Sequence, residues 1–156
     1  KVVLDEGYAR SAVITKGNDK YGYIYLPDFY ADFEREDGHR CSEDVAKEIV
    51  KLKAENVKGI TIDVRYNGGG SLYEVVQMVG LFIDKGPVVQ IRDKSGRSQV
   101  LYDETPGTLY DGPLVVMEMI PPVTSPYSAA TPPVITWSWS ISDSGTKLPW
   151  TRIPST

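Results

Sequence analysis

The stretch from Gly59 to Val76, GITIDVRYNGGGSLYEVV, decides the fold of this chain. Residues 58–64 carry β-branched apolar side chains at alternate positions, which predicts a central strand. After the glycines, apolar residues recur at helical spacing and predict a helix over residues 72–84. Ser71 stands directly before that helix, where a serine hydroxyl accepts from a free backbone N–H, and is the predicted N-cap.

Three consecutive glycines, Gly68, Gly69 and Gly70, join the strand to the helix. Glycine adopts positive φ and admits a close backbone or ligand, at a folding cost of about 0.5–1 kcal/mol each. A glycine turn at a helix start presents backbone N–H groups to negative charge. A nucleotide site, a purely structural turn and an oxyanion hole all fit this arrangement. Because the nucleotide fingerprints G-x-G-x-x-G and G-x-x-x-x-G-K-[ST] are missing, we favour the oxyanion hole.

Shorter patterns predict the elements around this centre. Ser42 is the predicted cap of a helix that runs to about residue 56, and acidic residues occupy its first turn. Helix, strand and helix in succession predict a layered α/β core. The other predicted strands cover residues 2–4, 11–15, 21–26, 87–92, 99–102 and 113–117.

Three segments carry a resemblance to a known family. They are YGYIYLPDFY (21–30), GITIDVRYNGGGSLYEVVQMVGLFIDKGPVVQIRDKSGRSQVLYD (59–103) and YDGPLVVM (110–117). They resemble the C-terminal processing peptidases, also called tail-specific proteases, and the likeness runs over residues 1–117.

The resemblance implies a fold and an activity. The fold is a Clp-protease/crotonase-like layered core, and the activity is that of a serine endopeptidase that cleaves proteins near their C-termini through a Ser–Lys dyad. By this likeness the backbone amide of Gly70 is an oxyanion donor, and Gly68 and Gly69 bind substrate. The expected partner is the C-terminus of a polypeptide, and no cofactor or metal is expected.

The sequence after Met117 departs from the family. Its members continue approximately V-[ND]-x-x-S-A-S-A-S-E, with the nucleophile as the second serine, and later G-K-G-T-V-Q, with the lysine base. This chain reads EMIPPVTSPYSAATPPVITW. Counted without gaps, the nucleophile position falls on Thr124, with Ser125 and Ser128 nearby, and Lys147 is the lysine at about the right distance.

These departures predict that the chain is inactive. A serine hydroxyl needs a base to take its proton, and lysine serves only where burial lowers its pKa from about 10.4 toward neutrality. Proline breaks a helix interior by about 3 kcal/mol. The catalytic helix is therefore not expected to form. The prolines concerned are Pro121, Pro122, Pro126, Pro132 and Pro133.

The composition also changes near this point. Seven of the eleven prolines and all three tryptophans lie within residues 119–156. We therefore predict a partial peptidase core over residues 1–117, without the PDZ domain that relatives place before it, and an irregular Pro/Ser/Thr-rich tail over 118–156. A divergent tail, a chimera and an out-of-frame reading all explain the change, and we favour the last two. Residues 135–142, ITWSWSIS, alternate as an added edge strand would.

Composition and charge exclude several functions. A hydrophobic fraction of 41% over 156 residues supports one folded domain, and a net charge of −4 with a pI near 5.0 argues against a nucleic-acid partner. No apolar run is long enough to span a membrane. The resemblance implies a periplasmic or cell-envelope location. The alternative function is a non-catalytic peptide-binding module that uses the same glycine turn to hold a carboxylate.

Three further features are interpreted as structural. The acidic stretch DFYADFEREDGH, residues 28–39, lacks the fixed register of a calcium loop and is interpreted as solvated. Cys41 is expected beside a helix start and not as a nucleophile. Asp63 and Arg65 flank the end of the predicted central strand and are expected to support the glycine turn.

Overall fold

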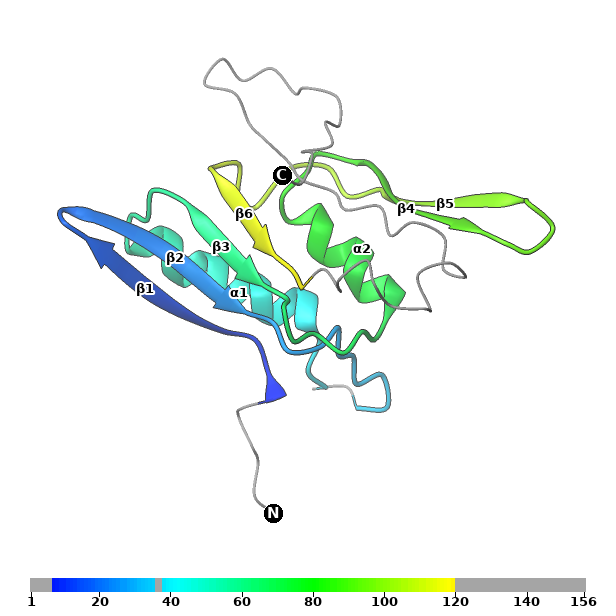
Figure 1. The fold of residues 1–156 in the computed structure, drawn as a ribbon, viewed down its shortest axis with the longest axis horizontal. Helices are drawn as coiled ribbons and strands as arrows, with labels where there is room; N and C mark the ends of the chain where they lie inside the picture. Colours follow the sequence, from blue (N-terminus) through cyan, green and yellow to red (C-terminus); the bar gives the residue numbers. More distant parts are fainter. Residues whose placement is uncertain (1–6, 36–37, 120–156) are drawn as a thin grey trace.

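Residues 7–35 and 38–119 are described in the computed structural model, where four strands form one sheet and two more form a separate hairpin (Figure 1). The helices are α1 (Cys41–Ala54) and α2 (Leu72–Gly80). The strands are β1 (Arg10–Lys16), β2 (Asp19–Tyr25), β3 (Ile60–Asp63), β4 (Gly86–Arg92), β5 (Ser98–Asp103) and β6 (Leu114–Met117).

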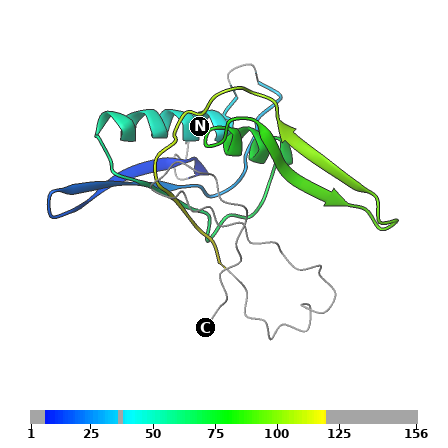
Figure 2. The same cartoon turned by 90° about the horizontal axis from the view of Figure 1, so that it is seen from above.

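The main sheet has the order β1-β2-β3-β6. β1 and β2 pair antiparallel, whereas β2–β3 and β3–β6 pair parallel. The chain passes through α1 between β2 and β3, and through α2 and the β4–β5 hairpin between β3 and β6. Figure 2 shows both helices on the same side of the sheet and the hairpin reaching away from it. Two successive crossovers therefore cover one face of the sheet.

The core lies between this face and the helices. Ile60 and Ile62 of β3 are buried and face the helix layer, as their alternation predicts. Burying each such side chain stabilises the fold by about 1.5–3 kcal/mol. The buried apolar residues of α1 recur every three or four positions, which is why this helix packs along one stripe; they are Cys41, Val45, Ile49 and Leu52.

β6 is an edge strand in the part of the chain that the structure describes, because it pairs only with β3. Val115 and Val116 remain 56% and 47% exposed. The free edge of β6 therefore presents unpaired backbone groups, and the two valines leave apolar surface exposed on the two faces of the strand.

The layered α/β class predicted from the sequence is confirmed. The strands predicted at 11–15, 21–26, 58–64, 87–92, 99–102 and 113–117 and the helix at 42–56 correspond to elements of the structure, with ends displaced by at most two residues. The segments predicted as strands at 2–4 and 135–142 lie outside the described residues. Within the described residues no helix is long and apolar enough to cross a membrane.

The prediction that helix 72–84 continues to residue 84 is wrong, because α2 ends at Gly80. A Cβ on Gly80 would lie 2.7 Å from the carboxylate of Asp103, so the β5 end packs against the helix at this point. Beyond it, Lys85 (φ 51°) and Gly86 (φ 146°) take positive φ and redirect the chain into β4. The apolar residues after Gly80 keep helical spacing, but they lie in a turn.

The prediction that Ser42 caps α1 is also wrong. The N-cap is Arg40, which is extended and makes no side-chain capping bond, and Ser42 is the second residue of the helix. The N-terminus of α1 is capped instead by Glu74 of α2, whose carboxylate accepts a hydrogen bond from the backbone N–H of Ser42. A partner distant in sequence has replaced the local one.

Candidate active site

The glycine turn is held against the segment that follows β2. The backbone N–H of Phe29 donates to the carbonyl of Gly69 (2.7 Å), and the N–H of Ser71 donates to the carbonyl of Phe29 (2.8 Å). Phe29 and Gly70 thus pair as an isolated parallel bridge. A Cβ on Gly70 would lie 2.3 Å from the Phe29 carbonyl oxygen, and both Gly69 (φ 104°) and Gly70 (φ 135°) have positive φ. The turn therefore requires glycine at these two positions.

Two of the three glycine amides already have hydrogen-bond acceptors. The N–H of Gly68 donates to the Pro27 carbonyl (3.2 Å) and to Asp28 Oδ1 (3.1 Å). The N–H of Gly69 donates to Asn67 Oδ1 (2.8 Å). These bonds fix the conformation of the turn.

The amide of Gly70 differs from the other two. Among residues 7–35 and 38–119, no group accepts a hydrogen bond from its N–H. The amide stands directly before α2, and the Ser71 hydroxyl caps this helix as predicted by accepting from Glu74 N (3.4 Å). The positive end of the helix dipole and a free N–H therefore coincide, which favours a negative ligand or oxyanion at this point.

Tyr30 anchors the segment that supports the turn. Its carbonyl accepts from the N–H of Cys41 (3.0 Å), and its hydroxyl donates to Asp44 Oδ2 (3.0 Å) and accepts from Ala9 N (2.9 Å). Burial raises the pKa of the Tyr30 hydroxyl. Burial alone would also raise the pKa of Asp44, but hydrogen bonds from Lys47, His39 and Tyr30 outweigh it and lower that pKa. The glycine turn thus rests on a segment that is itself fixed to α1.

Glu74 joins the first turns of the two helices. It is fully buried on α2, and its Oε2 accepts from Ser42 N (3.0 Å), Ser42 Oγ (2.6 Å) and Cys41 Sγ (3.7 Å). Its other oxygen has no partner among the described residues. Burial and the neighbouring Glu74 carboxylate raise the pKa of the Cys41 thiol to about 12. Cys41 is therefore a buried thiol beside a helix start, as predicted.

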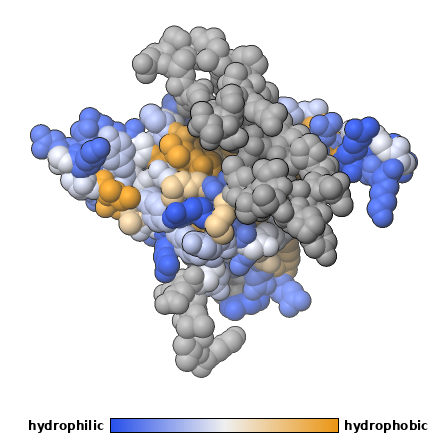
Figure 3. Space-filling model, viewed as in Figure 1, coloured by the Kyte–Doolittle hydropathy of each residue, from blue (hydrophilic) through white to orange (hydrophobic). Residues whose placement is uncertain are grey.

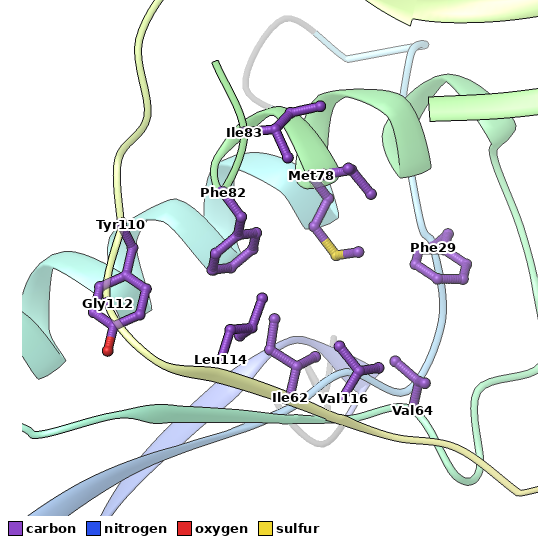
Figure 4. Close-up of a pocket in the computed structure, with 11 residues that line it drawn as sticks. Phe29, Ile62, Val64, Met78, Phe82, Ile83, Tyr110, Gly112, Leu114 and Val116 are labelled. Carbon is purple, nitrogen blue, oxygen red and sulfur yellow. The ribbon is translucent and has the colours of Figure 1, made fainter. Parts of the chain in front are cut away.

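An apolar cavity of about 220 Å³ lies between α2 and the sheet. Figure 4 shows side chains from α2 and the turn after it facing those from β3 and β6 across this space, with Phe29 at one end. Because the backbone of Phe29 also bridges Gly70, the cavity and the turn share this residue. The lining includes Phe29, Ile62, Val64, Met78, Phe82, Leu114 and Val116.

Asp63 and Arg65 pair with each other at the end of β3. Asp63 is buried, and its carboxylate accepts from Arg65 Nη2 (2.7 Å), Arg65 N (3.0 Å) and the Tyr23 hydroxyl (2.5 Å). The Arg65 hydrogen bonds outweigh burial and hold the pKa of Asp63 well below its usual range. The bond from Tyr23 to this carboxylate raises the pKa of Tyr23. The Asp63–Arg65 pair therefore stabilises the bend between the end of β3 and the glycine turn.

The acidic stretch does not assemble a metal site in the described part of the chain, where no three potential ligands come together. Its histidine, His39, lies 2.9 Å from Asp44 through Nδ1 and stacks on Tyr8 at 4.1 Å between ring centroids. Glu36 and Asp37 lie outside the described residues.

Thr124 and Lys147, the positions assigned to nucleophile and base, also lie outside the described residues. Sequence patterns do not indicate the roles of Phe29, Tyr30 and Glu74 around the turn. Their contacts join residues distant in the chain or are made by backbone atoms, so no local sequence pattern predicts these contacts. The one signal that points to Phe29 and Tyr30 is the motif DFY, which begins three residues after the end of β2 and belongs to the segments that carry the resemblance.

Comparison with protein families matches residues 20–118 to a model described as Peptidase family S41. Among characterised relatives, the tail-specific protease of Haemophilus influenzae is 36% identical over 117 residues, which is 75% of this chain and 16% of that protein. The chloroplastic carboxyl-terminal-processing peptidase 2 of Arabidopsis thaliana is 34% identical over 77 residues, 49% of this chain and 13% of the relative. The chain thus spans less than a fifth of these relatives.

A solved structure shares the fold. The photosystem II D1 C-terminal processing protease superposes with a TM-score of 0.59 at 20% identity, covering 76% of this chain and 31% of that one. The layered arrangement of sheet and helices is therefore one that this protease also has.

Proposed function

Because this chain belongs to peptidase family S41, we propose that it is part of a serine endopeptidase core that cleaves polypeptides near their C-termini. The observation that supports this most directly is the Gly70 amide, which has no acceptor among the described residues and stands at the start of α2. Names of relatives from two organisms specify tail-specific or carboxyl-terminal processing, which is the source of the proposed substrate class.

The proposed role of Gly70 follows from the chemistry of acyl transfer. Attack of a serine hydroxyl on a peptide carbonyl forms a tetrahedral intermediate whose oxygen carries negative charge. A fixed N–H directed at that oxygen stabilises the transition state, and removal of one such donor costs about 3–4 kcal/mol. Phe29 holds the turn from one side, so the amide needs little reorganisation when charge develops. Gly68 and Gly69 would then shape the substrate-binding turn, since their own amides are already bonded to Asp28 and Asn67.

This chain by itself is proposed to be inactive. Counted without gaps, Thr124 falls at the position expected for the nucleophile, and Lys147 is not set in the lysine motif expected for the family. The test is incubation of the full chain with an unstructured polypeptide such as casein. We expect no turnover, and cleavage that disappears in Thr124→Ala or Ser128→Ala would overturn the proposal of inactivity.

A chimera tests the assignment of Gly70. Residues 20–118 would replace the matched segment of the Haemophilus influenzae tail-specific protease, which supplies the remainder of that enzyme. In the chimera, an ester linkage in place of the peptide amide at Gly70 removes the N–H without adding a Cβ. We expect kcat to fall about 100-fold or more with KM little changed. The same replacement at Gly69, whose N–H bonds Asn67, should lower stability but not kcat to that extent.

A second candidate is a non-catalytic peptide-binding module. It is favoured by two observations: the Gly70 amide has no acceptor in the described part of the chain, and the sequence departs from the family's nucleophile motif. A serine-reactive phosphonate separates the two candidates, because a covalent adduct supports the enzyme, whereas peptide binding without an adduct supports the module.

The remaining assignments follow from the family. A polypeptide is the proposed partner, and a periplasmic or cell-envelope location is proposed from the tail-specific relatives. Acyl transfer by a serine and a lysine uses only protein groups, so the proposed reaction includes no cofactor.

A further inference from the structure

The face of the sheet opposite the helices carries an ordered row of side chains. Arg10 on β1 pairs in register with Tyr25 on β2, and Tyr25 pairs with Asp63 on β3. Register partners project from the same face, and neighbouring strands lie about 4.8 Å apart. Figure 3 looks onto this face and shows hydrophilic side chains, in blue, beside hydrophobic ones, in orange. The row lies at the carboxyl ends of parallel strands β2 and β3, where α/β sheets place their ligands.

Two guanidinium groups, those of Arg10 in this row and of Arg65 next to it, are each held by a partner on the sheet. Arg65 is fixed by the buried Asp63 through Nη2 (2.7 Å) and Nε (3.0 Å), and its side chain is still 46% exposed. Arg10 lies over the ring of Tyr25, 5.1 Å from its centroid. Because Tyr25 and Asp63 are register neighbours, the two guanidinium groups are held above adjacent strands.

The charge of this groove is not balanced. Asp63 is the carboxylate that lines it, and it is already bonded to Arg65 and Tyr23. Arg10 has no ion-pair partner within residues 7–35 and 38–119. Two guanidinium charges against one carboxylate leave a net charge of +1, which matches a single carboxylate better than a dianionic phosphate. The exposed ring of Tyr66 completes the groove.

We propose that this carboxylate groove, formed by Arg10, Tyr25, Asp63, Arg65 and Tyr66, binds the terminal carboxylate of a polypeptide. The inference rests on the proposed function, since it concerns the C-terminus of the same substrate. Guanidinium groups bind carboxylates through paired N–H donors, and prior fixation by Asp63 and Tyr25 lowers the entropy lost on binding.

The position of the groove also bears on where cleavage would occur. Arg65 stands five residues before Gly70 in the sequence, and a chain advances at most about 3.6 Å per residue. The two Cα atoms are therefore at most about 18 Å apart, a span that about five to six extended residues cover. An extended peptide of about six residues is therefore long enough to connect the carboxylate groove with the Gly70 amide.

Fluorescence anisotropy with the full chain tests the proposal. The probe is a fluorescein-labelled decapeptide with an apolar C-terminal half, in free-acid form and in C-terminally amidated form. We expect the amide to bind about tenfold or more weakly, because it lacks the charge that two guanidinium groups recognise. Arg10→Gln should lower the affinity for the free-acid peptide by a similar factor and leave the affinity for the amidated peptide unchanged. The matched control is Arg97→Gln, which removes an exposed arginine of the β4–β5 turn that is bonded to Asp93.

Several outcomes would overturn the proposal. They are equal affinity for the acid and the amide, no binding of either peptide, and equal weakening by Arg10→Gln and Arg97→Gln. Displacement of the free acid by inorganic phosphate at lower concentration than by N-acetylalanine would also overturn it, since the groove would then be a general anion site. None of these results affects the ester test at Gly70, so failure of the groove and failure of the proposed protease function can be told apart.

A second variant serves if Arg10→Gln proves poorly folded. Arg65→Lys keeps the positive charge beside Asp63 but cannot present paired N–H donors to a second carboxylate. Arg65→Lys should lower the affinity for the free-acid peptide severalfold and leave the affinity for the amidated peptide unchanged. Unchanged affinity for the free acid in a folded Arg65→Lys variant would also overturn the proposal.

Discussion

Glu74 on α2 accepts hydrogen bonds from both the backbone N–H and the hydroxyl of Ser42 on α1, at 3.0 and 2.6 Å. A single carboxylate thus occupies the N-terminus of α1 while its own backbone N–H is capped by Ser71. The two helices that cover the sheet are joined at their first turns, and the second of them begins immediately after the glycine turn and its cap.

Removal of this carboxylate should destabilise the whole helix layer. Glu74→Ala leaves two buried donors of Ser42 without an acceptor, and hydrogen bonds to charged groups contribute about 1.5–3 kcal/mol each. We expect the free energy of unfolding in urea to fall by about 2–4 kcal/mol, with partial recovery in Glu74→Gln. Glu55→Gln, which removes an exposed partner of Lys20, is the control and should change the unfolding free energy little. Equal effects at both positions would contradict the capping role.

The two positive-φ glycines should differ in their tolerance of alanine. A Cβ on Gly69 would enter open space, whereas a Cβ on Gly70 would meet the Phe29 carbonyl at 2.3 Å. Both substitutions carry backbone strain of about 1–3 kcal/mol, and only Gly70→Ala adds a collision with backbone. Urea denaturation should therefore rank wild type above Gly69→Ala and Gly69→Ala above Gly70→Ala. The reverse order would show that Phe29 does not press against the turn.

Local patterns predict the strand, the glycine turn and the capped helix because each depends on neighbouring residues. The alternation of Ile60 and Ile62 and the hydroxyl of Ser71 act within a few residues, and the structure follows them. The family, too, could be predicted, since the segments that carry it surround the turn.

The errors have a common physical origin. Ser42 is predicted as a cap, but Glu74 provides that cap from another helix, and the predicted α2 runs past the point where Asp103 packs on Gly80. In each case a contact between residues distant in sequence replaces the local preference. Phe29 escapes prediction for a related reason, because it supports the turn through its backbone, which every residue possesses.

Acid should weaken the fold through Asp63. Its pKa lies below the ordinary 3.8 when folded, because Arg65 and Tyr23 bond the ionised form. A depressed folded pKa gives stability that is present above the unfolded value and is lost as the pH falls through the folded value. Between about pH 5 and pH 2, wild type should therefore lose unfolding free energy more steeply than Asp63→Asn.

The control for this prediction is Asp93→Asn. The pKa of Asp93 is also lowered, first by the Ser95 hydroxyl, but the carboxylate lies in an exposed turn where solvent screens its interactions. Asp93→Asn should therefore change the dependence of the unfolding free energy on pH less than Asp63→Asn does. Identical slopes for wild type and Asp63→Asn in urea titrations at several pH values would contradict the role assigned to the Asp63–Arg65 pair.

The thiol of Cys41 should be unreactive in the folded protein. Burial and the Glu74 carboxylate raise its pKa to about 12, so it stays protonated at about pH 8, and only the thiolate attacks disulfide reagents. Reaction with Ellman's reagent should be slow in buffer and complete in guanidinium chloride. Since the chain has one cysteine, a single equivalent is expected on unfolding. Rapid labelling in buffer would show that the α1 terminus opens readily.

The edge formed by β6 has a practical consequence for anyone who produces this segment alone. Among residues 7–35 and 38–119, β6 has one neighbouring strand and exposed valines, so it is a template onto which another extended chain can add, and association of this kind rises with concentration. Dilute samples, or a lysine placed at Val115 to discourage stacking of copies, give the best prospect of observing the monomer.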